Sequence, residues 1–171
     1  MTTFEKIYDE ELDYVLGALS RLGIPRRNRE DQAHEVFMVI HRKLDTYDRE
    51  RPLRPWLFGI CFRVASEYRR RARNVREMLT EPTPPDRNAT SHQQLQAKQA
   101  RKIVGQAIQA INIERRAVFV LHELDEYTIP EVAEGLSIPL NTAYSRLRLA
   151  REDFERAARK ILDRSSKEET A

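Results

Sequence analysis

Three prolines fall within residues 81–91, EPTPPDRNATS, and they divide the 171-residue chain into two parts. Proline lacks a backbone N–H and its ring clashes with the preceding turn, so a helix cannot continue through this run. The remaining residues of the run are polar and bury little apolar surface. We therefore predict a flexible linker at 80–92, between an N-terminal domain at 1–79 and a C-terminal domain at 93–171.

Apolar residues on both sides of this linker recur with the period of an α-helix. The segment DQAHEVFMVIHRKL has them at 33, 36, 37, 40 and 44, the spacing of one buried stripe. A second amphipathic pattern runs from Tyr8 to Leu22 and stops at Gly23 and Pro25. Alternating apolar and polar runs, which are typical of strands, do not occur. The expected fold class is all-α, with two small helical domains.

Composition limits the kinds of function that remain. The net charge is only +3, so a nucleic-acid surface has to be identified from the distribution of charge. Cys61 is the single cysteine, which excludes an internal disulfide framework and fits a reducing cytosol; we expect a buried structural thiol rather than a redox switch. The four histidines lack metal-ligand spacing, so we predict no metal and no cofactor. Neither a signal peptide nor a membrane-spanning segment is recognisable, and we expect a soluble cytoplasmic protein.

The strongest local signal is a helix-turn-helix pattern in YTIPEVAEGLSIPLNTAYSRLRLAREDF. Thr128 and Glu131 have the spacing of a capping box at the start of a short helix. Gly135 and Ser137 are expected to end that helix. Asn141 or Thr142 is then expected to cap a second helix.

The second helix of this pattern has one apolar and one polar side. The apolar side holds Ala143, Leu147, Ala150 and Phe154, and the opposite side holds Asn141, Ser145, Arg148 and Glu152, with Tyr144 on its flank. Amide, hydroxyl, guanidinium and phenol groups suit the base edges of a major groove. Arg146 and Arg151 lie nearer the sides of the helix, where they can reach the phosphate backbone. The alternative is an ordinary solvated helix face.

Arginines and aromatic residues are interleaved in RERPLRPWLFGICFRVASEYRRRARNVRE. Between Arg63 and Arg76 the only acid is Glu67, and aromatic residues lie just upstream. Arginines attract phosphates, and aromatic rings hold unstacked bases, so this combination suits capture of a single strand. The helical spacing is equally compatible with Trp56 and Phe62 as core residues.

The polar side of the 31–44 segment has a different character. Asp31 and Glu35 are four residues apart and therefore adjacent on a helix surface, next to His34 and Arg42. An acidic spot is suited to a basic patch on a protein partner, although a solvated helix face is the usual alternative.

From about Tyr8 to Arg159 the chain resembles the extracytoplasmic-function (ECF) sigma factors of bacterial RNA polymerase, a small two-domain class. The resemblance is carried by EDQAHEVFMVIHRKLDTYD, RPLRPWLFGICFRVASEYRRR and ERRAVFVLHELDEYTIPEVAEGLSIPLNTAYSRLRLARE. It implies an alternative sigma factor that binds core RNA polymerase and directs promoter-specific transcription initiation, without enzymatic activity or a small-molecule substrate. It also implies regulation by an anti-sigma factor.

The resemblance assigns expected roles by position. Polymerase binding is expected of Asp31, His34 and Glu35. Recognition of the melted non-template strand at the minus-ten element is expected of Tyr47, Arg49, Arg51, Arg54, Trp56, Arg63, Arg69 and Arg70. Recognition of the minus-thirty-five duplex is expected of Thr142, Tyr144, Ser145, Arg146, Arg148 and Arg151.

Three residues depart from the family's usual pattern. His34 stands where glutamine is usual, Arg63 where many members have asparagine, and Tyr144 where arginine is frequent. The change at His34 leaves the expectation of polymerase binding in place. From Arg63 and Tyr144 we expect a promoter sequence that differs from those of better-known members.

Two other classes of function fit the sequence less well. A conventional helix-turn-helix regulator of duplex operators has no use for the arginine–aromatic segment. An enzyme is disfavoured because the sequence has no glycine-rich phosphate loop, nucleophile elbow or metal set.

Overall fold

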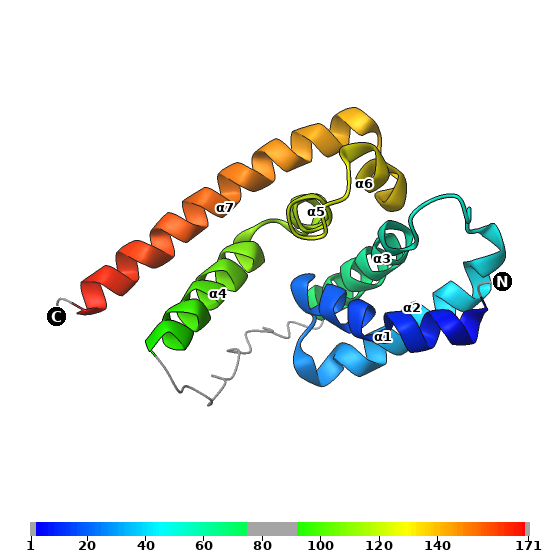
Figure 1. Cartoon of the computed structure of the whole chain (residues 1–171), viewed down its shortest axis with the longest axis horizontal. Coiled ribbons are helices and arrows are strands. Elements are labelled where there is room, and N and C mark those ends of the chain that lie inside the picture. The colour runs from blue at the N-terminus through cyan, green and yellow to red at the C-terminus, as the bar shows by residue number, and fades with distance from the viewer. Residues whose placement is uncertain (1–2, 75–91, 170–171) are drawn as a thin grey trace.

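The computed structural model describes residues 3–74 and 92–169, and within these ranges every regular element is helical. The N-terminal lobe consists of α1 (Phe4–Arg21), α2 (Arg26–Lys43), a 3₁₀ turn (Leu44–Thr46) and α3 (Leu53–Asn74). The C-terminal lobe consists of α4 (His92–Ala110), α5 (Ile113–Phe119), a π-helical turn (Val120–Leu124), α6 (Ile129–Leu136) and α7 (Leu140–Glu169). This two-lobed arrangement confirms the expected all-α fold class (Figure 1). The predicted linker lies outside the described residues except at His92, where α4 begins.

The three helices of the N-terminal lobe pack around an apolar core. The stripe expected on α2 is buried at Ala33, Val36, Phe37 and Ile40. It faces α1 and α3, whose own apolar residues are part of the same buried cluster. Gly23 joins α1 to α2 with a φ of 90°, a left-handed conformation that favours glycine. The amphipathic pattern therefore ends where the sequence indicated.

The predicted capping box forms at the start of α6, the first helix of the helix-turn-helix. The Thr128 N–H donates to the Glu131 carboxylate at 2.8 Å, and the Glu131 N–H donates to the Thr128 hydroxyl at 3.5 Å. These two bonds make the predicted capping box. Ser137 ends the helix in a left-handed conformation with a φ of 55°.

Two details of the predicted turn were wrong. Gly135 does not itself end α6: it is the penultimate residue of the helix, its backbone lies close to α3, and Ser137 alone takes the left-handed conformation after the last turn. Neither Asn141 nor Thr142 caps α7, which begins at Leu140. Pro139 stands directly before this helix instead, and its carbonyl accepts the Ala143 N–H at 3.1 Å. The fixed φ of proline suits the beginning of a helix.

The apolar side of α7 faces the C-terminal lobe, as predicted. Ala143, Leu147 and Ala150 are buried, and the half-buried Phe154 ring stacks on Phe119 with 5.1 Å between centroids. The polar side of α7 is therefore directed away from α5.

The two lobes touch along α3 and α6, which lie next to each other in Figure 1. Buried residues of both lobes belong to one continuous cluster. The sequence did not predict this contact.

Candidate nucleic-acid interface

Tyr144, Ser145 and Arg148 form an exposed face at the start of α7. The Tyr144 side chain is 54% exposed, and the half-buried Thr142 lies beside this face. Arg148 donates to Glu152 at 2.8 Å, a surface pair of the kind that contributes little to stability and can be exchanged for another acceptor. The face thus presents phenol, hydroxyl and guanidinium groups, which bind base edges and phosphates.

Arg146 and Arg151 connect α7 to the rest of its lobe. Arg146 lies 3.2 Å from the carboxylate of Glu114 on α5, and Arg151 pairs with Glu123 on the π-helical turn. Both arginines therefore hold α7 against the other helices of its lobe.

The rings of Tyr47 and Trp56 contact each other in a tilted arrangement where the chain enters α3. Their ring centroids are 4.9 Å apart, and the Tyr47 hydroxyl donates to the carbonyl of Arg51. Burial, and secondarily the charge of Asp48, raise the pKa of the Tyr47 hydroxyl. Trp56 is half-buried against the core, so it serves as a core residue and also keeps a partly open ring beside Tyr47.

The three arginines near the Tyr47–Trp56 pair have different surroundings. Arg49 is exposed. Arg51 pairs with Asp48 at 3.1 Å and with Glu134 of α6 at 3.4 Å. Arg54 pairs with Glu11 at 2.9 Å and lies 4.7 Å from the centre of the Tyr14 ring. Both Arg51 and Arg54 thus have a carboxylate partner on another helix, Glu134 of α6 and Glu11 of α1.

The arginines farther along α3 surround the lone acid Glu67. Arg70 donates to this carboxylate at 3.0 and 2.6 Å, and Arg71 donates at 3.2 Å. Hydrogen bonding to Arg70, followed by the charges of both arginines, lowers the pKa of Glu67. Arg69 is half-buried, and burial and the charge of Arg73 lower its pKa. Arg63 is exposed and donates to the carbonyl of Gly59 at 3.2 Å.

Asp31, His34 and Glu35 are all exposed on one face of α2. One turn further, the Met38 side chain is 46% exposed on the same face. Sequence reasoning missed Met38, although its position outside the buried stripe was a usable signal. Exposed methionine adapts to many partner surfaces, so this face combines acids with an apolar contact.

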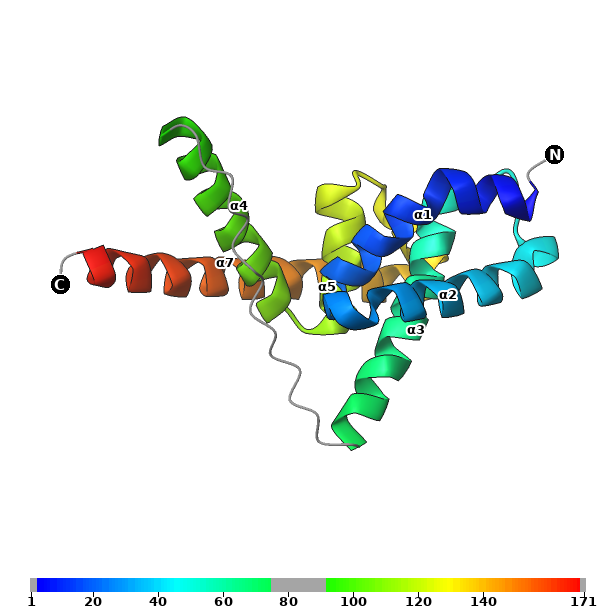
Figure 2. The same ribbon diagram turned by 90° about the horizontal axis from the view of Figure 1, so that it is seen from below.

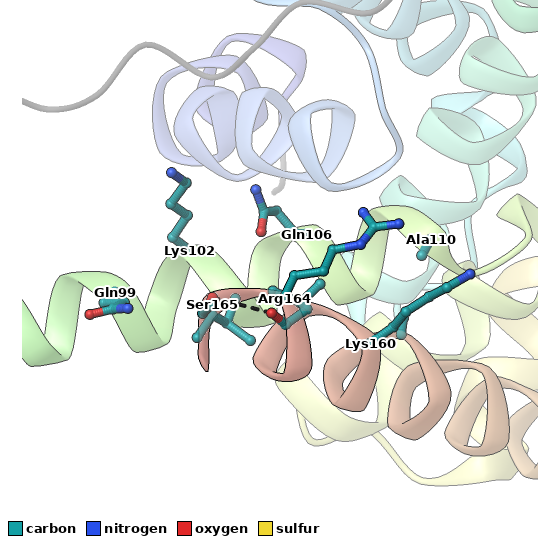
Figure 3. A pocket seen from close by; sticks show the side chains of 10 residues that line it. Gln99, Lys102, Gln106, Ala110, Lys160, Arg164 and Ser165 are labelled. Atoms are coloured by element: carbon teal, nitrogen blue, oxygen red, sulfur yellow. Dashed lines mark hydrogen bonds between the residues drawn. The ribbon is translucent and has the colours of Figure 1, made fainter. Parts of the chain in front are cut away.

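An open groove of about 820 Å³ lies between α4 and α7 and was also not predicted (Figure 3). Figure 2 shows the two helices diverging with distance from α5. Lys102 of α4 and Lys160 and Arg164 of α7 line the groove, together with Ile103 and Ile161. The angle between two helices depends on tertiary packing and has no local sequence signal.

Arg116 is a buried arginine at the junction of the lobes, with only 2% of its surface exposed. It donates to the carbonyls of Gln109 and Ile111 at 2.7 and 2.8 Å, and to the carbonyl of Arg21 in the other lobe at 3.3 Å. Burial, and then the charge of Arg69, lower its pKa to about 10, so the guanidinium remains charged at neutral pH. Arginine is rarely buried, and no local pattern distinguishes Arg116 from the other arginines of the chain.

Among the residues that the structure describes, no helix is both long and apolar enough to cross a bilayer.

Both lobes match known protein families. Residues 7–75 match the family described as Sigma-70 region 2, and residues 101–154 match Sigma-70, region 4. Among characterised proteins, the chain is 24% identical to the ECF RNA polymerase sigma factor SigX of Bacillus subtilis, over 94% of this chain and 88% of that protein. It is 26% identical to the RNA polymerase sigma factor NccH of Alcaligenes xylosoxydans xylosoxydans, over 78% of this chain and 75% of that protein.

Solved structures share the fold across both lobes. The sigma factor RpoE of Bartonella quintana, solved in complex with the anti-sigma factor NepR, superposes with a TM-score of 0.69 at 18% identity, covering 91% of this chain and 96% of RpoE. CnrH, solved in complex with the cytosolic domain of CnrY, superposes with a TM-score of 0.58 at 21% identity, covering 94% of this chain and 87% of CnrH. With region 2 in one lobe and region 4 in the other, the chain belongs to the sigma-70 family of transcription initiation factors, in its ECF class, whose members are not enzymes.

Proposed function

We propose that this chain is an alternative sigma factor that acts in the cytoplasm, binds core RNA polymerase and selects a particular set of promoters. In this proposal a domain at 1–79 binds polymerase and the minus-ten element, and a domain at 93–171 binds the minus-thirty-five element. The segment at 80–92 links them. The chain needs no cofactor and no small-molecule substrate.

The observation that carries the proposal is the exposed face of α7 on the second helix of a helix-turn-helix. Tyr144, Ser145 and Arg148 are exposed on the side of α7 opposite to the side that is buried against the lobe. Each good base contact in a major groove contributes about 1–3 kcal/mol of discrimination. Thr142, Arg146 and Arg151 flank this face and are proposed to contact the same duplex.

At the minus-ten element the proposed reader is the tilted ring pair of Tyr47 and Trp56 with the arginines around it. Extruding a base from DNA costs a few kcal/mol, and stacking on an aromatic ring returns about 1–3 kcal/mol. Arginines at this site add salt-sensitive phosphate contacts. We assign these contacts to Arg49, Arg51, Arg54, Arg63, Arg69 and Arg70.

Polymerase binding is proposed for the exposed face of α2. Asp31 and Glu35 supply negative charge, His34 lies between them, and Met38 supplies apolar area on the same face. Within the described part of the chain neither carboxylate has an ion-pair partner, so both are available to basic groups of another protein.

We further propose that an anti-sigma factor regulates the chain. RpoE and CnrH, which share its fold, were each solved in complex with a partner protein, the anti-sigma factor NepR in one case and the cytosolic domain of CnrY in the other.

A run-off transcription assay with core polymerase tests this function. Transcripts that start at defined sites only when the chain is added are expected, and sequencing their ends reveals the promoter. A conventional helix-turn-helix regulator would instead bind duplex DNA tightly without polymerase. Nanomolar, sequence-specific binding of the isolated chain to duplex promoter, with no dependence of transcription on it, would contradict the proposal.

A further inference from the structure

Leu140 is an exposed leucine at the point where the second helix of the helix-turn-helix begins. Its spacing to Ala143 and Leu147 continues the buried stripe of α7, and those two residues are 0% and 5% exposed. Leu140 is nevertheless 44% exposed and lies outside the apolar core cluster. A leucine in the register of the buried stripe is thus left largely uncovered, at the outer edge of its lobe (Figure 1).

The start of α7 is the part of a helix-turn-helix that reaches DNA. The second helix of the motif lies in the major groove, and its N-terminal residues contact the base edges. Leu140 is the first residue of α7, and Tyr144 and Arg148 follow at intervals of four residues, so the three side chains lie in one row over successive turns. All three are exposed, and Tyr144 and Arg148 are already part of the proposed reading face.

Leucine restricts the base group that this end of the row can favour. Its side chain has no hydrogen-bond donor or acceptor, so it cannot pair with the polar edge of a base. The apolar group that a base presents in the major groove is the C5-methyl of thymine, which apolar side chains contact. Tyr144, one turn along, adds its ring to the same side. A polar base edge placed against this leucine would lose its water without gaining a partner.

We propose that Leu140 determines part of the promoter specificity by contacting the methyl group of one thymine in the minus-thirty-five element. This inference rests on the proposed sigma-factor function and adds to it a base and the residue that reads it. Arg148 lies eight residues further along α7, or about 12 Å at 1.5 Å per residue, so it reads a different base.

The test removes the methyl group and leaves the rest of the base unchanged. The promoter is first identified by sequencing the transcripts that the chain produces with core polymerase. Each thymine on either strand of its minus-thirty-five element is then replaced, one at a time, by deoxyuridine, which lacks the C5-methyl and keeps the hydrogen-bonding atoms. Run-off transcription at limiting holoenzyme measures the effect of each replacement.

Two substitutions at Leu140 and one control are compared with the wild type. Leu140→Ala removes most of the proposed contact, and Leu140→Met keeps an apolar side chain of similar size. Leu140 is exposed and both replacements favour helix, so the variants are expected to fold, which circular dichroism verifies. Leu162→Ala is the matched control, because it makes the same change at a leucine of α7 that is 50% exposed, about six turns further along.

With the wild-type chain, deoxyuridine at one thymine is expected to lower initiation about fourfold. At 1.4 kcal/mol per tenfold change this equals about 0.8 kcal/mol, the size expected when one methyl group is removed from an apolar contact. With Leu140→Ala, thymine and deoxyuridine at that position are expected to give equal initiation. Leu140→Met and Leu162→Ala are expected to keep the preference for thymine.

The inference would be overturned if every thymine that matters to the wild type matters equally to Leu140→Ala, because another residue would then contact the methyl group. A wild type that is insensitive to all the replacements, or an element without thymine on either strand, would overturn it as well. In these cases transcription still depends on the chain. If no transcript depends on it, the sigma-factor function itself fails and the role of Leu140 falls with it, so the two failures are distinguished.

Discussion

The hydroxyl of Tyr14 donates to Asp125 at 2.9 Å, joining two residues 111 positions apart and the two lobes of the molecule. Asp125 also accepts from Arg21 at 3.0 Å, so its carboxylate receives two donors from the N-terminal lobe. Burial first, and then the charge of Asp125 and the hydrogen bond to it, raise the pKa of Tyr14 well above its usual range. Tyr14 therefore remains a neutral donor at any physiological pH.

Tyr14→Phe is predicted to lower the free energy of unfolding by about 1 kcal/mol, because one buried hydrogen bond is lost while the ring is retained. Urea denaturation measures this change. Tyr8→Phe, whose side chain is 42% exposed, is the control and is expected to change stability by less than about 0.5 kcal/mol. Equal effects of the two substitutions would show that the Tyr14 bond does not stabilise the fold.

The stability of the chain is predicted to fall above pH 9 because of Cys61. Burial raises the pKa of its thiol from 9.0 to about 12. Between these values the unfolded chain releases a proton that the folded chain keeps, so the free energy of unfolding decreases by up to about 1.4 kcal/mol per pH unit. Below pH 9 this contribution is fully present and constant.

The raised pKa of Tyr14 also lowers the free energy of unfolding at high pH. Urea denaturation of the wild type and Cys61→Ala at several pH values between 8 and 11 separates the contribution of the thiol from that of Tyr14. Cys61→Ala is expected to show a shallower decline, whatever constant loss the smaller side chain causes. Parallel declines would mean that the thiol ionises equally in both states. The wild-type thiol is also expected to resist thiol-specific reagents until the chain unfolds, as its burial requires.

Arg148→Ala is predicted to weaken initiation by about 1–3 kcal/mol at promoters that carry the preferred minus-thirty-five base, and to reduce discrimination at that base. Run-off transcription across a set of promoters substituted in this element measures both effects. Arg159→Ala, an exposed arginine three turns further along α7, is the control. A uniform loss across all promoters would show that Arg148 contacts phosphate rather than a base.

Met38→Ala is predicted to weaken binding to core polymerase by about 1–2 kcal/mol while leaving the unfolding free energy nearly unchanged, because the side chain is 46% exposed. Titration of labelled chain with core polymerase measures the affinity. Leu162→Ala, at a residue that is 50% exposed on the other lobe, provides the comparison. Unaltered affinity for Met38→Ala would place the polymerase contact elsewhere.

Local patterns were sufficient to predict the helices of the N-terminal lobe and the helix-turn-helix, whereas α4 and α5 were not predicted individually. The stripe on α2 and the Thr128–Glu131 capping box depend on residues within one or two turns of each other, so the sequence displays them directly. At the end of α6 the prediction was correct for Ser137 and wrong for Gly135. Gly135 is still helical, and its backbone lies against Pro55, 80 positions away, a contact that a local pattern does not display.

The surroundings of the candidate site residues were largely beyond sequence reasoning. The pairing of Arg51 with Glu134, the bracing of Arg146 by Glu114 and the burial of Arg116 all depend on how distant helices pack. An arginine in a sequence pattern gives no sign of whether it is free to meet a phosphate or already engaged by a carboxylate. The exposed face of α7 was predictable because a single helix determines which of its side chains lie opposite its apolar side.

Gly59 of α3 and Gly135 of α6, whose backbones meet where the two lobes dock, have a consequence for heritable variation in this protein. Every missense change at either codon adds at least one carbon where a carbonyl already stands, so no conservative replacement exists at Gly59 or Gly135. A lineage can either retain both glycines together or lose the docked arrangement, and the joint occurrence of glycine at these two positions would mark which natural variants still keep it.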